Sequence, residues 1–164
     1  MFPHQFSLPE DNQLLELILA KICRAGDLAV IPPKTSTEFV GKDSREFILD
    51  ELKRSEVSFD ILTKLVDMLV RKNEKPVTLI LESKPEKGYM IDYEKKFQRW
   101  RQKHLQASCY EMMVSLPAYD EEHQLILIYI GHRRHALAGA GDVILFKNED
   151  RKLKPLGGAM MWIA

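Results

Sequence analysis

The hydrophobic pattern of this chain changes its period once, near residue 108, and that change limits the folds open to it. Before it, apolar side chains recur at helical spacing over 9–24, 44–53, 58–72 and 92–104. After it, β-rich runs follow one another at 109–116, 124–130, 142–147 and 158–163. The short connections favour antiparallel neighbours and hence a β-meander. This order predicts an α+β fold, with N-terminal helices packed on one face of an antiparallel sheet formed mainly by the C-terminal meander.

The clearest helix is expected over 58–72, where Ser58 is a good N-cap and Asp60 complements the helix dipole. Its apolar stripe consists of Ile61, Leu62, Leu65, Val66, Leu69 and Val70. Two further short strands are expected at 27–31 and 77–81, and the stretch at 33–42 is expected to be a loop. The run at 125–130 is apolar on both faces, which is typical of a central, covered strand.

Length and composition place the whole chain, 1–164, in one globular domain. The 24 basic and 24 acidic side chains cancel, which removes the general attraction to nucleic acid or anionic membranes. The apolar runs, such as 17–20 and 125–130, are too short to span a bilayer. The first residues do not resemble a secretory signal, so the chain as given is expected in the cytoplasm, or outside it if a leader was removed. Cys23 and Cys109 are expected to be buried thiols rather than a disulfide.

The most unusual stretch follows the central strand, where four polar residues, mostly cationic, run into a loop with several glycines. Arg133 and Arg134 are suited to hold a carboxylate or phosphate in bidentate fashion. Backbone N–H groups freed by Gly139 and Gly141 would add donors. The same stretch is typical of a solvated strand end with a tight turn. A small anionic ligand or a protein is therefore the expected partner of this loop.

A metal site is the alternative interpretation of the same loop. His132 and His135, joined by Asp120 from the neighbouring loop, would offer two imidazoles and a carboxylate to zinc. If the strand continues through this stretch, however, successive side chains alternate between faces and the two histidines separate. No ligand spacing matches a known metal motif, and the glycines do not form a dinucleotide fingerprint. The sequence therefore indicates no cofactor.

Catalytic signatures are missing elsewhere as well. Ser115 does not lie in a nucleophile elbow, and Cys109 has no basic neighbour to activate it. The basic run at 99–104 contains Trp100, but Trp100 shares a helical stripe with Tyr93 and Phe97. That spacing favours a core residue with a wet basic face over a nucleobase platform.

The C-terminal third resembles a loose family of uncharacterised bacterial domains, common in Bacteroidota and often exported or lipid-anchored. The resemblance rests on the segments at 115–120, 125–131, 137–146 and 161–164. In that family, an extended start with a serine, a proline, an aromatic and an acidic residue leads into an apolar strand, a Gly-x-Gly turn, a second strand and a terminal Trp strand. The chain departs from the pattern at 132–138, where many relatives carry cysteines. The resemblance implies the strand order and export, and no activity.

Three hypotheses about function follow. The leading one is a non-catalytic binding or interaction domain, with the cationic loop at 132–135 as its contact surface. The second is a small metal-dependent hydrolase using His132, His135 and nearby carboxylates. The third is a structural or oligomeric module. The sequence favours a non-catalytic role because no catalytic constellation is present.

Overall fold

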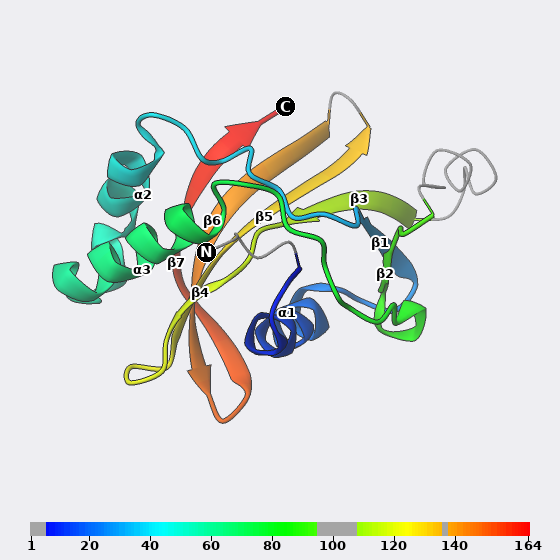
Figure 1. Ribbon diagram of the computed structural model, residues 1–164, viewed down its shortest axis with the longest axis horizontal. Coiled ribbons are helices and arrows are strands. Elements are labelled where there is room, and N and C mark those ends of the chain that lie inside the picture. Colours follow the sequence, from blue (N-terminus) through cyan, green and yellow to red (C-terminus); the bar gives the residue numbers. More distant parts are fainter. Residues whose placement is uncertain (1–5, 95–107, 136–137) are drawn as a thin grey trace.

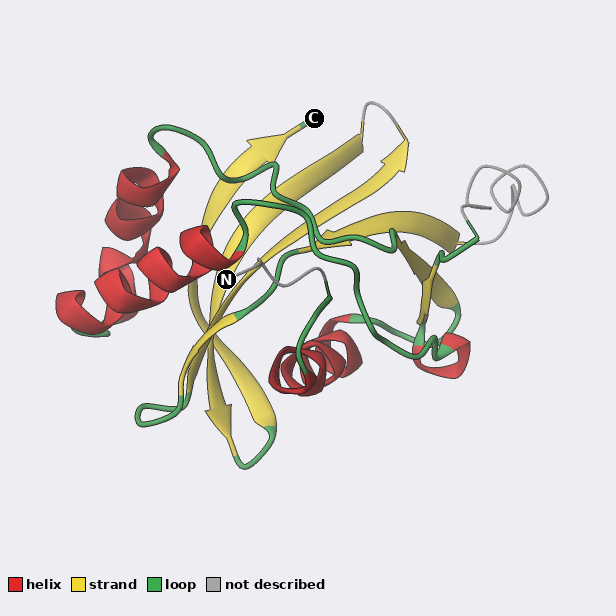
Figure 2. Cartoon of the chain, viewed as in Figure 1, coloured by secondary structure: helices red, strands yellow, loops and turns green. Residues whose placement is uncertain are grey.

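The computed structural model describes residues 6–94, 108–135 and 138–164. The described part contains the helices α1 (Pro9–Ile22), α2 (Ser44–Leu52) and α3 (Phe59–Lys72) and the 3-10 turns η1 (Lys53–Ser55) and η2 (Pro85–Lys87). Its strands are β1 (Asp27–Ile31), β2 (Tyr89–Ile91), β3 (Ser108–Val114), β4 (Ala118–Asp120), β5 (Leu125–His135), β6 (Ala138–Glu149) and β7 (Lys152–Ile163). Figure 2 shows these elements coloured by type.

All seven strands form one sheet in the order β2-β1-β3-β5-β6-β7, with β4 paired to β5. The C-terminal strands pair antiparallel, as the meander requires, whereas β1 lies parallel to both β2 and β3. The sheet is therefore mixed, with its antiparallel part built from the C-terminal strands. The α+β prediction is confirmed.

The arrangement of the helices differs from the expectation in one respect, because they cover both faces of the sheet (Figure 1). On one face, α1 packs over Ile126, Ile128 and Ile130 of β5; we call this the α1 face. On the other, α2 and α3 pack over Leu125, Leu127 and Tyr129; we call this the α2/α3 face. The two-residue alternation of a strand sends these two sets apart. A strand that is apolar on both sides needs cover on both, and the helices divide accordingly.

The helix over 58–72 begins one residue late, at Phe59, and otherwise follows the prediction. The Ser58 hydroxyl accepts a hydrogen bond from the Ile61 N–H at 3.4 Å, as expected of an N-cap. Leu62, Leu65 and Leu69 are buried along the predicted stripe. The strand at 27–31 is also found as predicted.

The strand expected at 77–81 is wrong. Thr78 makes only isolated bridges there, and neighbouring backbone N–H groups find partners in several different segments. The Leu79 N–H donates to the Pro33 carbonyl at 2.8 Å, and the Ile80 N–H donates to the Ser7 hydroxyl at 2.8 Å. The segment at 77–81 therefore has the composition of a strand but forms an extended connection, since no continuous partner strand lies beside it in the described structure.

The loop expected at 132–141 is also wrong, because β5 continues to His135 and β6 resumes at Ala138. The loop at 117–123 contains β4. Most of the helix expected at 92–104, with the basic run around Trp100, lies outside the described residues. Cys23 and Cys109 are free thiols, with Cys23 buried and Cys109 partly exposed. Among the described helices, none is both long and apolar enough to cross a membrane.

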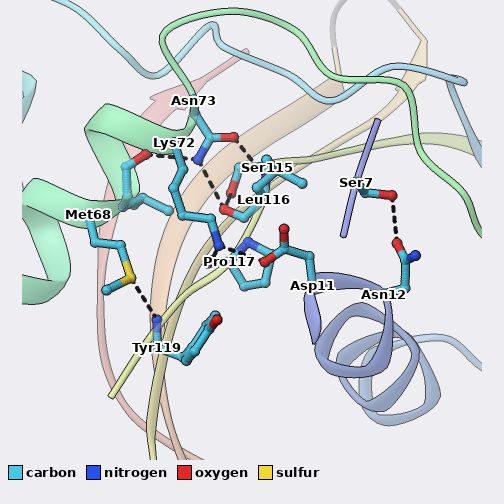
Figure 3. A network of polar contacts seen from close by, with 11 residues as sticks. Ser7, Asp11, Asn12, Met68, Lys72, Asn73, Ser115, Leu116, Pro117 and Tyr119 are labelled. Atoms are coloured by element: carbon cyan, nitrogen blue, oxygen red, sulfur yellow. Dashed lines mark hydrogen bonds and ion pairs between the residues drawn. The ribbon is translucent and has the colours of Figure 1, made fainter. Parts of the chain in front are cut away.

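A polar network ties α1 and α3 to the β3–β4 connection (Figure 3). The Lys72 ammonium donates to the Asp11 carboxylate at 2.6 Å and to the Pro117 carbonyl at 2.7 Å. The fully buried Asn73 bonds the Leu116 backbone in both directions, accepting from its N–H and donating to its carbonyl. Since an unpaired buried polar group is costly, this network fixes where the two helical layers meet.

Candidate functional site

Arg133 and Arg134 lie on opposite faces of the sheet. Because β5 continues as a strand, the side chain of Arg133 points to the α2/α3 face and that of Arg134 to the α1 face. Arg133 approaches the Glu38 carboxylate at 3.9 Å, and Arg134 donates to the Asp27 carboxylate at 3.1 Å. The structure therefore does not bring the two guanidinium groups together as a bidentate anion clamp.

The α2/α3 face carries a closed cluster of polar and aromatic side chains, the Tyr129 cluster, formed by Glu38, Tyr129, Arg133 and Trp162. The Trp162 indole N–H donates to the Tyr129 hydroxyl at 2.6 Å, and that hydroxyl donates to Glu38. Arg133 stacks over the Trp162 ring at 4.7 Å. Burial, and then the hydrogen bond to Glu38, raise the pKa of Tyr129, which is fully buried.

Two glycines make room for this cluster. Gly131 on β5 pairs with Gly141 on β6, and Gly141 lies opposite Trp162 on β7. A Cβ atom at Gly141 would collide with the Trp162 indole nitrogen and with the Tyr129 hydroxyl. At Gly131 it would come within 2.8 Å of the Tyr129 hydroxyl. The glycines are thus needed for close approach of side chains.

Gly139 and Gly141 do not form the expected anion nest. Both lie in the β6 ladder, where Gly139 pairs with Arg133, and neither has the positive φ of a left-handed turn. Gly139 also lies close to neighbours, since an added Cβ would approach the Arg133 and Trp162 side chains. The sequence pattern marked these glycines correctly as special but assigned them the wrong role.

On the α1 face, an open hollow lies beside Arg134, and we call it the Arg134 depression. It has a volume of about 330 Å³ and is lined by Ile22, Asp27, Tyr110, Met112, Ile130, His132, Arg134, Asp142 and Ile144. The apolar members come from α1, β3, β5 and β6 and form its floor. Arg134 stacks over the Tyr110 ring at 5.0 Å and holds Asp27 through one carboxylate oxygen. Acid, base and aromatic side chains therefore converge above an apolar base.

The pairing in this depression is incomplete. The second carboxylate oxygen of Asp27, Oδ1, is buried without a hydrogen-bond partner. Burial raises the pKa of the Cys23 thiol to about 11, the hydrogen bond with Tyr110 opposes that rise, and the charge of Asp27 adds to it. The pKa of Tyr110 rises to about 12, mainly through burial. The negative charge of Asp27 thus adds to the rise in the pKa of both Cys23 and Tyr110 at this end of the depression.

Asp142 is the second acidic side chain that lines the depression. It lies on β6 opposite Ile130, two register positions from His132. Burial raises the pKa of the Asp142 carboxyl, while the nearby His132 opposes that rise. A half-buried carboxyl beside an imidazole, at the mouth of a hollow, is the kind of group that functional sites contain.

The residues of the metal hypothesis do not converge. Asp120 pairs with Leu125 at the start of β5, whereas His132 lies seven residues further along the same strand. At the rise of a strand this separates them by about 23 Å. Asp120 instead accepts hydrogen bonds from the backbone and ring of His123, which lower its pKa. Of the His135 side chain nothing is described, and the described residues hold no group of three metal-ligating side chains.

Two larger hollows of about 440 and 560 Å³ flank the first half of α1. They are lined mainly by side chains of α1 and of turns, such as Gln13, Glu121 and Lys87. The Arg134 depression is smaller, but its polar groups face one another across one apolar floor. It is therefore the better candidate site.

Asp27, Tyr110, Asp142 and Glu38 were not predicted as site residues. Asp27 precedes a short strand, and Asp142 follows the last glycine of the 131–141 stretch, so each resembles an ordinary strand-end residue. The only available signal was the alternation of β5, which separates Arg133 from Arg134 once the strand is extended.

Comparisons with protein-family models, with curated proteins and with solved structures find no match for this chain. The resemblance to the Bacteroidota-type domains therefore stays a prediction. What can be said of function rests on the geometry of the two clusters.

Proposed function

We propose that this protein is a non-catalytic binding domain, and that the Arg134 depression is where it holds a small ligand. The observation that carries the proposal is the convergence of Asp27, His132, Arg134 and Asp142 above an apolar floor. Ligand sites typically combine an apolar base with a few convergent polar groups. The volume of about 330 Å³ is at the lower end of that class and suits a small molecule.

Comparison with the Tyr129 cluster supports the choice of the Arg134 depression as the binding site. Its hydroxyl, indole and carboxylate satisfy one another, and Phe39 stacks on the Tyr129 ring at 4.8 Å. In the Arg134 depression, the Asp142 carboxyl lines the hollow, and no hydrogen bond of this carboxyl is found among the described residues. A ligand would complete the pairing that the protein leaves open.

A fragment experiment tests the proposal without assuming a ligand class. Isotope-labelled protein is titrated with four probes, namely acetate, propylamine, glycerol and adenosine, and amide shifts are mapped by NMR. At least one probe is expected to shift amides of β3, β5 and β6 around the depression. The Arg134→Gln variant should alter that response, while Arg133→Gln, on the opposite face, should leave it unchanged. Shifts that are absent for all probes, or that persist equally in both variants, would overturn the proposal.

A second candidate, acid–base hydrolysis, is favoured by one observation. Asp142 has a raised pKa and lies two register positions from His132, so a general acid and a base share the hollow. Turnover of p-nitrophenyl acetate or p-nitrophenyl phosphate that disappears in Asp142→Asn would replace the binding proposal with this one. Equal background rates for both proteins would remove the hydrolase.

A further inference from the structure

We propose that the ligand of the Arg134 depression is a small cation, a primary amine with an apolar body. This inference rests on the proposed function and names the chemistry of that same site. It starts from the charges that line the hollow: two carboxylates, one guanidinium and one imidazole. Because Arg134 is engaged by Asp27, no lysine or arginine pairs with the Asp142 carboxylate among the described residues.

The geometry indicates where the two parts of such a ligand would lie. Asp142 and His132 are on neighbouring strands, and Ile130 lies directly across from Asp142. Met112, Ile130 and Ile144 provide the apolar surface beside that carboxylate. An ammonium group at Asp142, with its hydrocarbon body on these three side chains, would remove apolar area from water while completing an ion pair.

The opposite end of the depression also favours a cation over an anion. Arg134 already gives a hydrogen bond to Asp27 at 3.1 Å and covers the Tyr110 ring, so its positive charge is locally offset. The Asp27 carboxylate only accepts hydrogen bonds and offers nothing to a carboxylate or phosphate. An anion would be repelled by two carboxylates and attracted by one guanidinium. An amine would be attracted by two carboxylates and repelled by one guanidinium.

Three matched probes separate the ligand classes. Isoamylamine carries the ammonium, isoamyl alcohol has the same body without charge, and 4-methylpentanoate carries a carboxylate on a similar chain. Affinities are measured by NMR titration of amides around the depression at pH 8, where a histidine is ordinarily neutral. Isoamylamine is expected to bind at least about tenfold more tightly than the alcohol, which is about 1.4 kcal/mol. The carboxylate should bind more weakly than either.

Variants show whether the named carboxylate is responsible. Asp142→Asn should reduce the preference for isoamylamine over the alcohol to near unity, whereas the matched change Asp43→Asn, at an exposed position before α2, should leave the preference intact. Tighter binding of 4-methylpentanoate or of the alcohol, or an amine preference that survives in Asp142→Asn, would overturn the inference. If none of these probes binds while another fragment class still shifts the depression, the ligand class is wrong and the binding function stands. If no probe of any class binds there, both fail.

Discussion

Arg133 and Arg134 are neighbours in sequence with similar local chemistry and different surroundings. Each approaches one carboxylate, each stacks over one aromatic ring, and their side chains are exposed to similar extents, 50% and 52%. On the α2/α3 face, however, the carboxylate comes from the 32–43 segment and the ring from the C-terminal strand, and both close over Tyr129. On the α1 face, α1 ends at Ile22 and a depression remains.

This difference separates a structural role from a candidate binding role. A cluster whose donors and acceptors satisfy one another stabilises the fold and leaves no group for a ligand. A cluster with an unpartnered oxygen and a half-buried carboxyl contributes less to stability and more to recognition. The following predictions test that distinction, beginning with the largest expected effect.

Replacing Gly141 by Ala should disrupt the packing of the Tyr129 cluster on the α2/α3 face. The added methyl group would collide with Trp162 and Tyr129, so the free energy of unfolding should fall by about 3 kcal/mol. Urea denaturation measures the loss. Gly157→Ala on β7 is the matched control, because its nearest neighbour would lie at an ordinary 3.5 Å and little change is expected. Equal stability of the two variants would mean that Trp162 does not occupy this position.

Replacing Lys72 by Met tests whether the packing of α3 on one face of the sheet depends on α1 on the other face. Lys72 at the end of α3 holds Asp11 on α1, whose side chain is only 3% exposed. The change leaves that carboxylate buried without its cation, and a loss of about 2 kcal/mol is expected. The exposed Lys64→Met change on the same helix should be close to neutral in the same denaturation assay. If Lys64→Met is as damaging as Lys72→Met, general loss of charge on α3 explains the effect instead.

Tyr129→Phe removes the central hydroxyl of the closed cluster while keeping the ring. The Trp162 N–H loses its acceptor and Glu38 loses its donor, so a destabilisation of about 1 to 2 kcal/mol is expected. Tyr119→Phe serves as the comparison, since no hydrogen bond of its hydroxyl is found among the described residues. Thermal unfolding should show a clear loss for the first variant and almost none for the second. A neutral Tyr129→Phe would indicate that the closed cluster adds nothing to stability.

Asp142→Asn should have the smallest effect and the opposite sign. Because the folded protein raises the pKa of this carboxyl, ionisation of Asp142 opposes folding, and that cost is fully present above the raised pKa. It disappears as pH falls below the ordinary range of an aspartate, where the group is protonated in both states. The variant should therefore be slightly more stable than the parent at pH 7, by less than about 1 kcal/mol, and equal to it near pH 3. Melting temperatures recorded across this range check the prediction. A variant that is less stable at pH 7 would show that the carboxylate is well paired in the fold.

The sequence predicted those parts of the fold that depend on local periodicity. The stripe of α3, the cap at Ser58 and the strand at 27–31 follow from spacing and side-chain type within a few residues. It failed at 77–81, where strand propensity was present but a continuous partner strand was not. It also failed at 132–141, because glycines that permit a turn equally permit close packing, and the pattern does not distinguish these uses.

For the candidate site, the sequence identified Arg134 and His132 but not their partners. Asp27 is 107 residues from Arg134, and Glu38 is 91 residues from Tyr129. Such pairs arise only after β1 joins β3 and the 32–43 segment crosses the sheet, and no local pattern encodes them.

By itself, then, the sequence determined the α+β class and the strand series of the C-terminal third, since each depends on short-range repeats. Tertiary structure alone decided that helices cover both faces, that Trp162 and Glu38 close over Tyr129, and that a depression remains beside Arg134. The reason is that an alternating strand has two equivalent apolar sides. Only the packing of distant segments determines which side becomes fully covered and which keeps an opening.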